Sequence, residues 1–173
     1  MAIIPVKITK QIFDEATNRN IKYKNKFGNI GTHRINKDRQ RMTGYLAEAC
    51  IRSLYPEIKY SDSDVVDFIL NDITLDSKAQ GCNSKPLDYF SATLYEEQKS
   101  RNTDYYIFSR VKNDFTIAWI CGIISQSKFF DLAKFAPAGT QTNNFTYDQG
   151  RYEIPYKDLD NINTFIENIY ENI

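Results

Sequence analysis

The chain has 173 residues and carries 22 basic and 22 acidic side chains, so its net charge is zero. This length suits one domain with a substantial core, and the composition is that of an ordinary globular protein. No apolar run approaches the roughly 20 residues that a membrane-spanning helix needs. Three widely spaced cysteines and a single histidine, without a C-x-x-C motif, argue against a disulfide framework and a zinc site.

The first residues of the chain have neither the charged nor the apolar region of a signal peptide. The scarcity of cysteine indicates a reducing compartment. We therefore expect a soluble, intracellular protein, located in the cytoplasm (of the host cell, if a phage encodes it), with no membrane partner.

The first predicted element is a short helix over residues 8–18, with Ile8, Ile12 and Ala16 on one side and Thr9 near its cap. Positive charge is then concentrated between residues 18 and 42, where eight basic residues face the single acid Asp38. They are Arg19, Lys22, Lys24, Lys26, Arg34, Lys37, Arg39 and Arg41. Such asymmetry indicates a segment that binds phosphate groups. The alternative is a solvated arm that only keeps the protein soluble.

A second helix is predicted from a Thr43 cap to about Leu54, ended by Pro56. Glu48 lies in the middle of this helix, on the flank of its apolar stripe. A short strand is expected over residues 58–60.

Residues 65–79 predict a tight β-hairpin. Apolar strand-forming residues lead up to Asn71-Asp72 and away from it, and Asn and Asp tolerate the backbone of a two-residue turn. This turn would place Asp67 opposite Asp76, and because side chains alternate along a strand, Lys78 would share their face. The opposite face would be apolar and would consist of Val66, Phe68, Leu70, Ile73 and Leu75.

The second half of the chain predicts a helix over residues 87–100 and two strands over residues 105–111 and 115–124, joined by a turn at Asn113-Asp114. The strand 115–124 is nearly all apolar, as expected of a central strand covered on both faces. A helix capped by Ser125, a polar loop over 137–150, a strand over 152–156 and a final amphipathic helix follow.

This order of elements indicates an α/β protein, with a mixed (α+β) sheet flanked by helices. No internal repeat or linker divides the chain, so we expect one domain. It would comprise a basic N-terminal segment (1–41), a core (42–135) and a C-terminal strand and helix (136–173).

Two aspartates directly opposite each other on a sheet repel. A divalent metal between Asp67 and Asp76 would relieve that repulsion. The alternative is structural, since Asp67 and Lys78 could form a cross-strand ion pair on a solvated sheet face.

The constellation resembles the PD-(D/E)xK nuclease superfamily, whose sites are built on such a hairpin. Asp67 matches the first acid, Asp76-Ser77-Lys78 matches the (D/E)-x-K triplet, and Glu48 matches a glutamate that the family often places on a helix. The chain departs from the pattern in two ways: Val66 replaces the proline before the first acid, and the triplet begins with Asp rather than Glu.

The resemblance implies a restriction endonuclease-like αβββαβ core and a small Mg²⁺-dependent endonuclease acting on DNA, of phage or restriction type. Asp67, Asp76 and the Ser77 carbonyl would bind Mg²⁺, with Mn²⁺ able to substitute, and Glu48 would support the metal. Lys78 would act on the attacking water or the phosphate. By the same resemblance Gln98, on the predicted helix 87–100, could face the site, whereas the alternative is a solvated helix position.

The basic segment would then grip the DNA backbone without reading its sequence, and cutting both strands would require a two-fold homodimer. Lys85 and Arg101, which flank the predicted helix, could also contact phosphates. Two other functions remain open: a catalytically inactive nucleic-acid-binding protein of the same fold, and a protein-interaction or inhibitor protein that uses the acidic C-terminal part.

Overall fold

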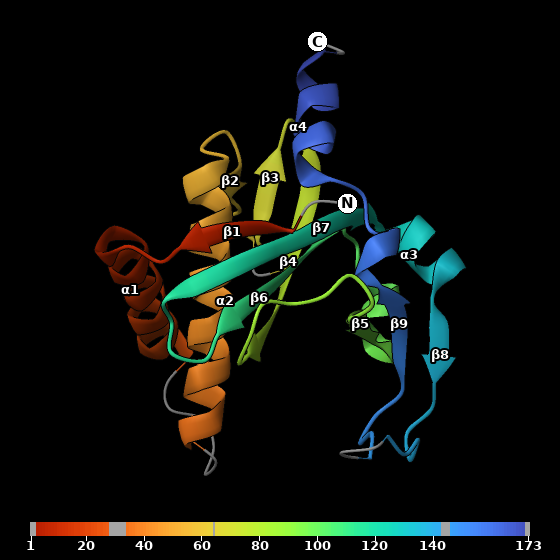
Figure 1. The fold of residues 1–173 in the computed structure, drawn as a ribbon. Coiled ribbons are helices and arrows are strands. Elements are labelled where there is room, and N and C mark those ends of the chain that lie inside the picture. Colours follow the sequence, from red (N-terminus) through yellow and green to blue (C-terminus); the bar gives the residue numbers. More distant parts are fainter. Residues whose placement is uncertain (1–2, 28–33, 64, 143–145, 172–173) are drawn as a thin grey trace.

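The structure is a computed structural model that describes residues 3–27, 34–63, 65–142 and 146–171. Over these residues the chain forms a mixed α/β fold with four α-helices, a curled six-stranded sheet and a separate three-stranded sheet (Figure 1). The predicted fold class is therefore confirmed. In the part of the chain that is described, no helix has both the length and the apolar character needed to cross a membrane.

The first half of the chain supplies the two long helices and four strands of the large sheet. Its elements are β1 (Ile4–Lys7), α1 (Lys10–Phe27), α2 (Arg34–Leu54), β2 (Lys59–Tyr60), β3 (Phe68–Leu70) and β4 (Ile73–Cys82). Both predicted helices exist but are longer than expected, because most of the described basic segment is helical. The Thr9 hydroxyl accepts a hydrogen bond from the Ile12 N–H at 3.3 Å, as expected near a helix start. Strand β1 was not predicted.

The second half completes the large sheet and builds the small one. Its elements are β5 (Ser91–Tyr95), the 3₁₀-helix η1 (Glu96–Ser100), β6 (Tyr105–Lys112), β7 (Ile117–Ser125), α3 (Gln126–Leu132), β8 (Lys134–Ala136), β9 (Arg151–Pro155), the 3₁₀-helix η2 (Tyr156–Asp158) and α4 (Ile162–Glu171). The predicted Ser125 cap is confirmed, since its hydroxyl accepts from the Lys128 N–H at 3.3 Å.

The prediction of a helix over residues 87–100 is wrong. This stretch forms β5 and η1, and β5 pairs antiparallel with β9, about sixty residues further along the chain. Ala92 and Leu94 alternate into the core, which is the two-residue period of a strand. The αβββαβ order is thus broken in the described chain, since β5 and η1 occupy the place of the helix that follows the hairpin.

The hairpin has the predicted register. Phe68 pairs with Leu75 and Leu70 with Ile73, while Asn71 and Asp72 adopt φ angles of 47° and 66°. Two successive positive φ values are those of a type I′ turn, which matches the twist of the flanking strands.

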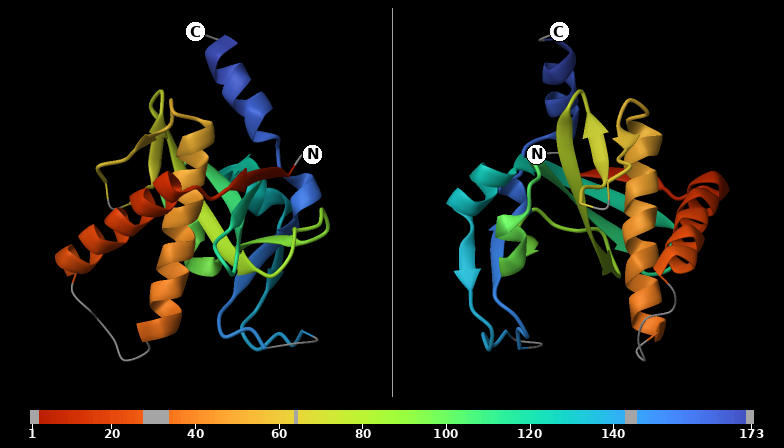
Figure 2. Two further views of the ribbon diagram at one scale, coloured as in Figure 1. Left: turned by 60° about the vertical axis from the view of Figure 1, so that its left-hand side comes forward. Right: turned by 180° about the vertical axis from the view of Figure 1, so that it is seen from behind.

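The large sheet has the strand order β1-β7-β6-β4-β3-β2, in which β4 and β6 are parallel. Helices α1 and α2 lie on one side of it, and the small sheet β5-β9-β8 with α3 lies on the other (Figures 1 and 2). One core packs α2 against the large sheet, and a second fills the space towards the small sheet. Strand β7 is buried along almost its whole length, as predicted for a central strand.

Candidate active site

Asp67 is placed by the hairpin, although it lies just outside the regular strand. The ladder between β3 and β4 ends at Phe68 and Leu75. Beyond that point the Ser77 backbone N–H donates a hydrogen bond to Asp67 Oδ2 at 2.8 Å. This bond holds the first acid beside the Asp76-Ser77-Lys78 triplet, as the sequence pattern predicted.

Asp76 is the most buried acid of the site, with 3% of its surface exposed. Lys78 Nζ lies 2.7 Å from Asp76 Oδ2, and Arg101 Nη1 lies 3.7 Å from the same oxygen. The triplet lysine therefore pairs with the triplet acid rather than with Asp67. Arg101 follows η1 directly, so the segment that replaces the predicted helix brings this second cation to the site.

Glu48 enters the site from α2 and is 6% exposed. Arg19 of α1 reaches across to it, with Nη2 at 2.7 Å from Glu48 Oε2. The Arg19 guanidinium also lies over the Tyr60 ring, 3.6 Å from its centroid. A cation over an aromatic face is attracted to the ring, so the ring and the carboxylate both fix Arg19 in place.

The pKa values show that the three acids interact with one another. Burial, followed by the charge and the hydrogen bond of Asp76, raises the pKa of Asp67 to about 7. Burial and the charges of Asp67 and Asp76 raise the pKa of Glu48 to about 8, outweighing the opposite effect of Arg19. The structure thus brings Glu48, Asp67, Asp76 and Lys78 into one electrostatically coupled, water-poor site.

The donor atoms suit a hard divalent cation in kind. Carboxylate and carbonyl oxygens are the ligands that Mg²⁺ prefers. Burial and the neighbouring carboxylates raise the pKa values of Glu48 and Asp67, and a cation beside them would favour their ionised forms. Among the described residues, however, no three His, Cys, Asp or Glu side chains are arranged to hold a metal ion. The acids face Arg19 and Lys78 instead, so metal binding requires these pairs to separate.

The basic segment is not a loose arm, because several of its charges are used within the protein. Arg19 pairs with Glu48, and Lys24 and Arg41 both pair with Asp38. Arg39 donates to the Asn113 carbonyl at 2.6 Å. Of the eight predicted contacts, four are exposed among those whose side chains are described: Lys22, Lys26, Lys37 and Arg39. Arg34 begins α2, and its side chain lies outside the described part.

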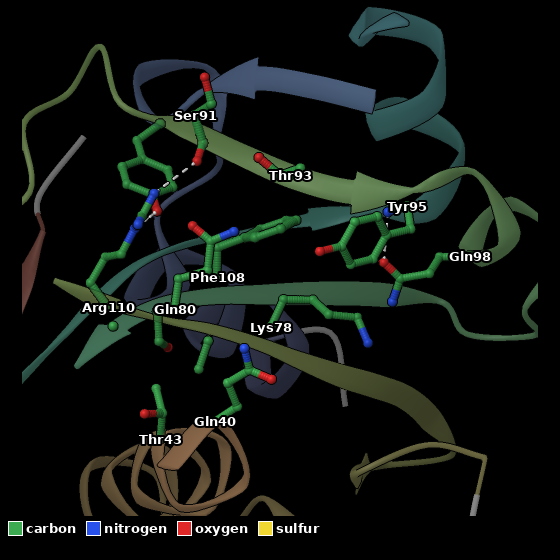
Figure 3. A pocket seen from close by; sticks show the side chains of 14 residues that line it. Gln40, Thr43, Lys78, Gln80, Ser91, Thr93, Tyr95, Gln98, Phe108 and Arg110 are labelled. Carbon is green, nitrogen blue, oxygen red and sulfur yellow. Dashed lines mark hydrogen bonds between the residues drawn. The ribbon is translucent and has the colours of Figure 1, made fainter. Parts of the chain in front are cut away.

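A cavity of about 520 Å³ opens beside Lys78, between α2 and β5 (Figure 3). Gln98 lines it and is 7% exposed, so this residue is not solvated. Gln80 and Arg110 also line it, and the sequence reasoning missed both. Gln80 could have been predicted from the sequence, because side chains alternate along β4 and Gln80 shares a face with Asp76 and Lys78. Nothing local in the sequence points to Arg110.

No known family model matches this chain, and neither does any curated protein sequence. The resemblance to the PD-(D/E)xK superfamily therefore rests on the residues described above and on their arrangement.

Proposed function

We propose that the chain is a metal-dependent nuclease that hydrolyses phosphodiester bonds in DNA, acting as an endonuclease in the cytoplasm of the cell that makes it. One observation carries this proposal: Glu48 and Asp76 are buried, and Asp67 and Lys78 lie half-buried beside them, at the end of a hairpin. Gathering like charges in a poorly solvated site is costly. A bound divalent cation would offset this repulsion and could in turn bind the phosphate of a substrate.

In this proposal Asp67 and Asp76 hold Mg²⁺, or Mn²⁺ in its place, with the Ser77 carbonyl as a further ligand and Glu48 in support. The metal would supply charge neutralisation at the phosphate and lower the pKa of a bound water. Lys78, once released from Asp76, would donate a hydrogen bond to the attacking water or to a phosphate oxygen. Arg101, whose side chain is 45% exposed, is placed to contact a neighbouring phosphate.

DNA would be held through the exposed basic side chains on α1 and α2, among them Lys22, Lys26 and Lys37. Contacts of this kind position the backbone and carry no sequence information. One site cuts one strand, so cleavage of both strands would require a homodimer.

The proposal is tested by incubating supercoiled plasmid and labelled single strands with the protein in Mg²⁺, Mn²⁺ or chelator. We expect metal-dependent cutting that Asp67→Asn, Asp76→Asn and Lys78→Ala each reduce by a factor of about 100 or more. Asp62→Asn and Lys134→Ala are matched controls, because both residues are exposed and neither belongs to the proposed site. Equal cutting by the wild type and the three site variants would refute the assignment.

A second candidate function is a nucleic-acid-binding protein without catalytic activity. It is favoured by the pairing of Lys78 with Asp76 and of Arg19 with Glu48, which neutralises the acids without a metal. Such a protein would bind DNA in chelator with a steep salt dependence, and Asp76→Asn would not weaken binding. If the protein neither cuts nor binds nucleic acid, a protein-interaction role remains.

A further inference from the structure

The cavity beside Lys78 continues the face of β4 that carries the triplet. Asp76, Lys78 and Gln80 lie on one face of the strand, because side chains alternate. Their partners on the parallel strand β6 are Tyr106, Phe108 and Arg110. Lys78, Gln80, Phe108 and Arg110 all line the cavity. The proposed catalytic centre and the cavity therefore meet at Lys78.

The cavity has polar walls on two opposing sides. Figure 3 shows Gln40 and Thr43 of α2 on one side and Ser91, Thr93 and Tyr95 of β5 on the other. Strand β5 is suited to this position because its intervening residues, Ala92 and Leu94, face the core. No aspartate or glutamate in the described chain lines the cavity. A ligand with negative charge thus meets no repelling carboxylate in these walls.

Gln98 is held so that its amide group faces this space. Its Oε1 accepts a hydrogen bond from the Tyr95 backbone N–H at 2.9 Å. Figure 3 shows the amide nitrogen on the side towards Lys78. The Tyr106 hydroxyl donates to the Gln98 backbone carbonyl at 3.0 Å, which fixes the backbone as well. The Gln98 amide is therefore a pre-positioned hydrogen-bond donor.

Arg110 is a second fixed group, and it lies away from Lys78 along the cavity (Figure 3). Its Nε donates to the Tyr156 hydroxyl at 2.5 Å, and its Nη2 donates to the Ser91 carbonyl at 3.3 Å. The guanidinium is thereby held on the wall of the cavity, where it can attract an anionic group. Arg110 thus gives this part of the cavity a positive charge, whereas Lys78 at the other part is paired with Asp76.

We infer that this cavity binds one unpaired nucleotide of the strand that is cut, adjacent to the phosphate at Lys78. The inference rests on the proposed function and specifies its substrate. The volume falls in the range of small-molecule sites. Glutamine amides offer both donors and acceptors to the edge of a base, and the exposed Tyr95 ring offers a face on which a base can stack.

A paired base cannot reach this cavity. Inside a duplex the base is stacked and hydrogen-bonded, and it enters a protein pocket only if it is already single-stranded or is rotated out of the helix. The substrate of this protein is therefore a single strand, or a duplex with an unpaired nucleotide at the cutting position.

The test compares the binding of three fluorescent oligonucleotides in chelator by anisotropy: a single strand, a perfect duplex, and a duplex with one central unpaired nucleotide. Gln80→Trp fills the cavity from an exposed position on β4. Gln98→Glu keeps the acceptor for the Tyr95 N–H but replaces the amide donor with a negative oxygen. Gln149→Trp is the control, because Gln149 is exposed and does not line the cavity.

We expect the wild type and Gln149→Trp to bind the single strand and the interrupted duplex about tenfold more tightly than the perfect duplex, since one stacked base contributes about that much. Gln80→Trp and Gln98→Glu should lose the preference. Equal binding of the three oligonucleotides by the wild type, or a preference that survives in both cavity variants, overturns the inference.

The plasmid assay separates this inference from the proposed function. Metal-dependent cutting without a preference for unpaired nucleotides leaves the nuclease standing and removes the nucleotide pocket. A preference that depends on Gln80 and Gln98, without any cutting, supports the pocket and removes the nuclease.

Discussion

Asp67 and Ser77 are joined across the hairpin by a hydrogen bond of 2.8 Å from the Ser77 backbone N–H to the Asp67 carboxylate. The bond lies beyond the last regular pair of the two strands, Phe68 and Leu75. The bond therefore continues the contact between the two arms of the hairpin and holds Asp67 close to Asp76. A buried and a half-buried carboxylate in this position repel unless one is protonated or a cation intervenes. The stability of the protein should consequently respond to pH, to neutral substitutions and to divalent cations.

The response to pH follows from the raised pKa values of Asp67, to about 7, and of Glu48, to about 8. In the unfolded chain both groups titrate near pH 4, so the folded state holds more protons between about pH 4 and pH 8. The contribution of these groups to the free energy of unfolding is therefore largest at the acid end and falls as pH rises through 7 and 8. The charged groups nearest to them are Asp76, Lys78 and Arg19.

Asp67→Asn isolates this effect, because an asparagine oxygen can still accept from the Ser77 N–H. We expect the variant to be more stable than the wild type at about pH 8.5, by on the order of 1–3 kcal/mol, and to show a smaller difference at about pH 5.5. Urea unfolding at the two pH values measures it. Asp62→Asn, at an exposed position, should leave the pH dependence unchanged. An Asp67→Asn curve parallel to that of the wild type would contradict the coupling.

Divalent cations should stabilise the wild type where the carboxylates are ionised. At a Mg²⁺ concentration tenfold above its dissociation constant, binding adds about 1.4 kcal/mol, which raises the melting temperature by about 3–6 °C for a chain of this length. The shift should grow from acid to alkaline pH and disappear in Asp76→Asn. KCl of equal ionic strength is the control. A melting temperature that does not move with Mg²⁺ or Mn²⁺ at any pH removes the metal from the proposal.

Arg19 should stabilise the folded protein through its ion pair with Glu48 rather than bind a ligand. Arg19→Ala removes the partner 2.7 Å from Glu48 Oε2 and the guanidinium over Tyr60, and we expect it to cost about 1–3 kcal/mol, more at alkaline pH than at acid pH. In a Glu48→Gln background the same change should cost clearly less, since no charge is left unpaired. A double-mutant cycle by urea unfolding measures the difference. Lys22→Ala, exposed on the same helix, should have little effect.

Two glycines differ in the space available for a side chain, so replacing each with alanine should have opposite effects on stability. Gly122 on β7 has a φ of +146°, and an added Cβ would lie 2.7 Å from Leu159 Cβ and 2.9 Å from the Asp160 carbonyl oxygen. Gly122→Ala should therefore cost about 2–4 kcal/mol. Gly44 on α2 has nothing within 4 Å of the same position, so Gly44→Ala should stabilise by up to about 1 kcal/mol. Thermal unfolding of both variants decides whether their effects differ in sign.

The hairpin and the position of its acids follow from the sequence because they depend on neighbours in the chain. Asn71-Asp72 accepts the two positive φ angles, and the turn then sets the pairing of Phe68 with Leu75. Once that register is set, alternation places Asp76 and Lys78 on one face of β4. Glu48 could be assigned to a helix in the same way, by the apolar period around it.

The predictions that were wrong concern contacts between segments that are distant in the sequence. Leu87, Phe90 and Leu94 have a spacing compatible with a helix. Residues 91–95 nevertheless form a strand, because β9 supplies backbone partners and a core for Ala92 and Leu94. Arg19 belongs to a basic stretch that suggests DNA contacts, yet α1 lies beside α2 and its guanidinium meets Glu48. Whether a charge faces solvent or another charge is set by packing, which the local sequence does not encode. The chain by itself therefore specified the acids and their hairpin, whereas long-range packing selected their cationic partners, raised their pKa values and formed the cavity beside Lys78.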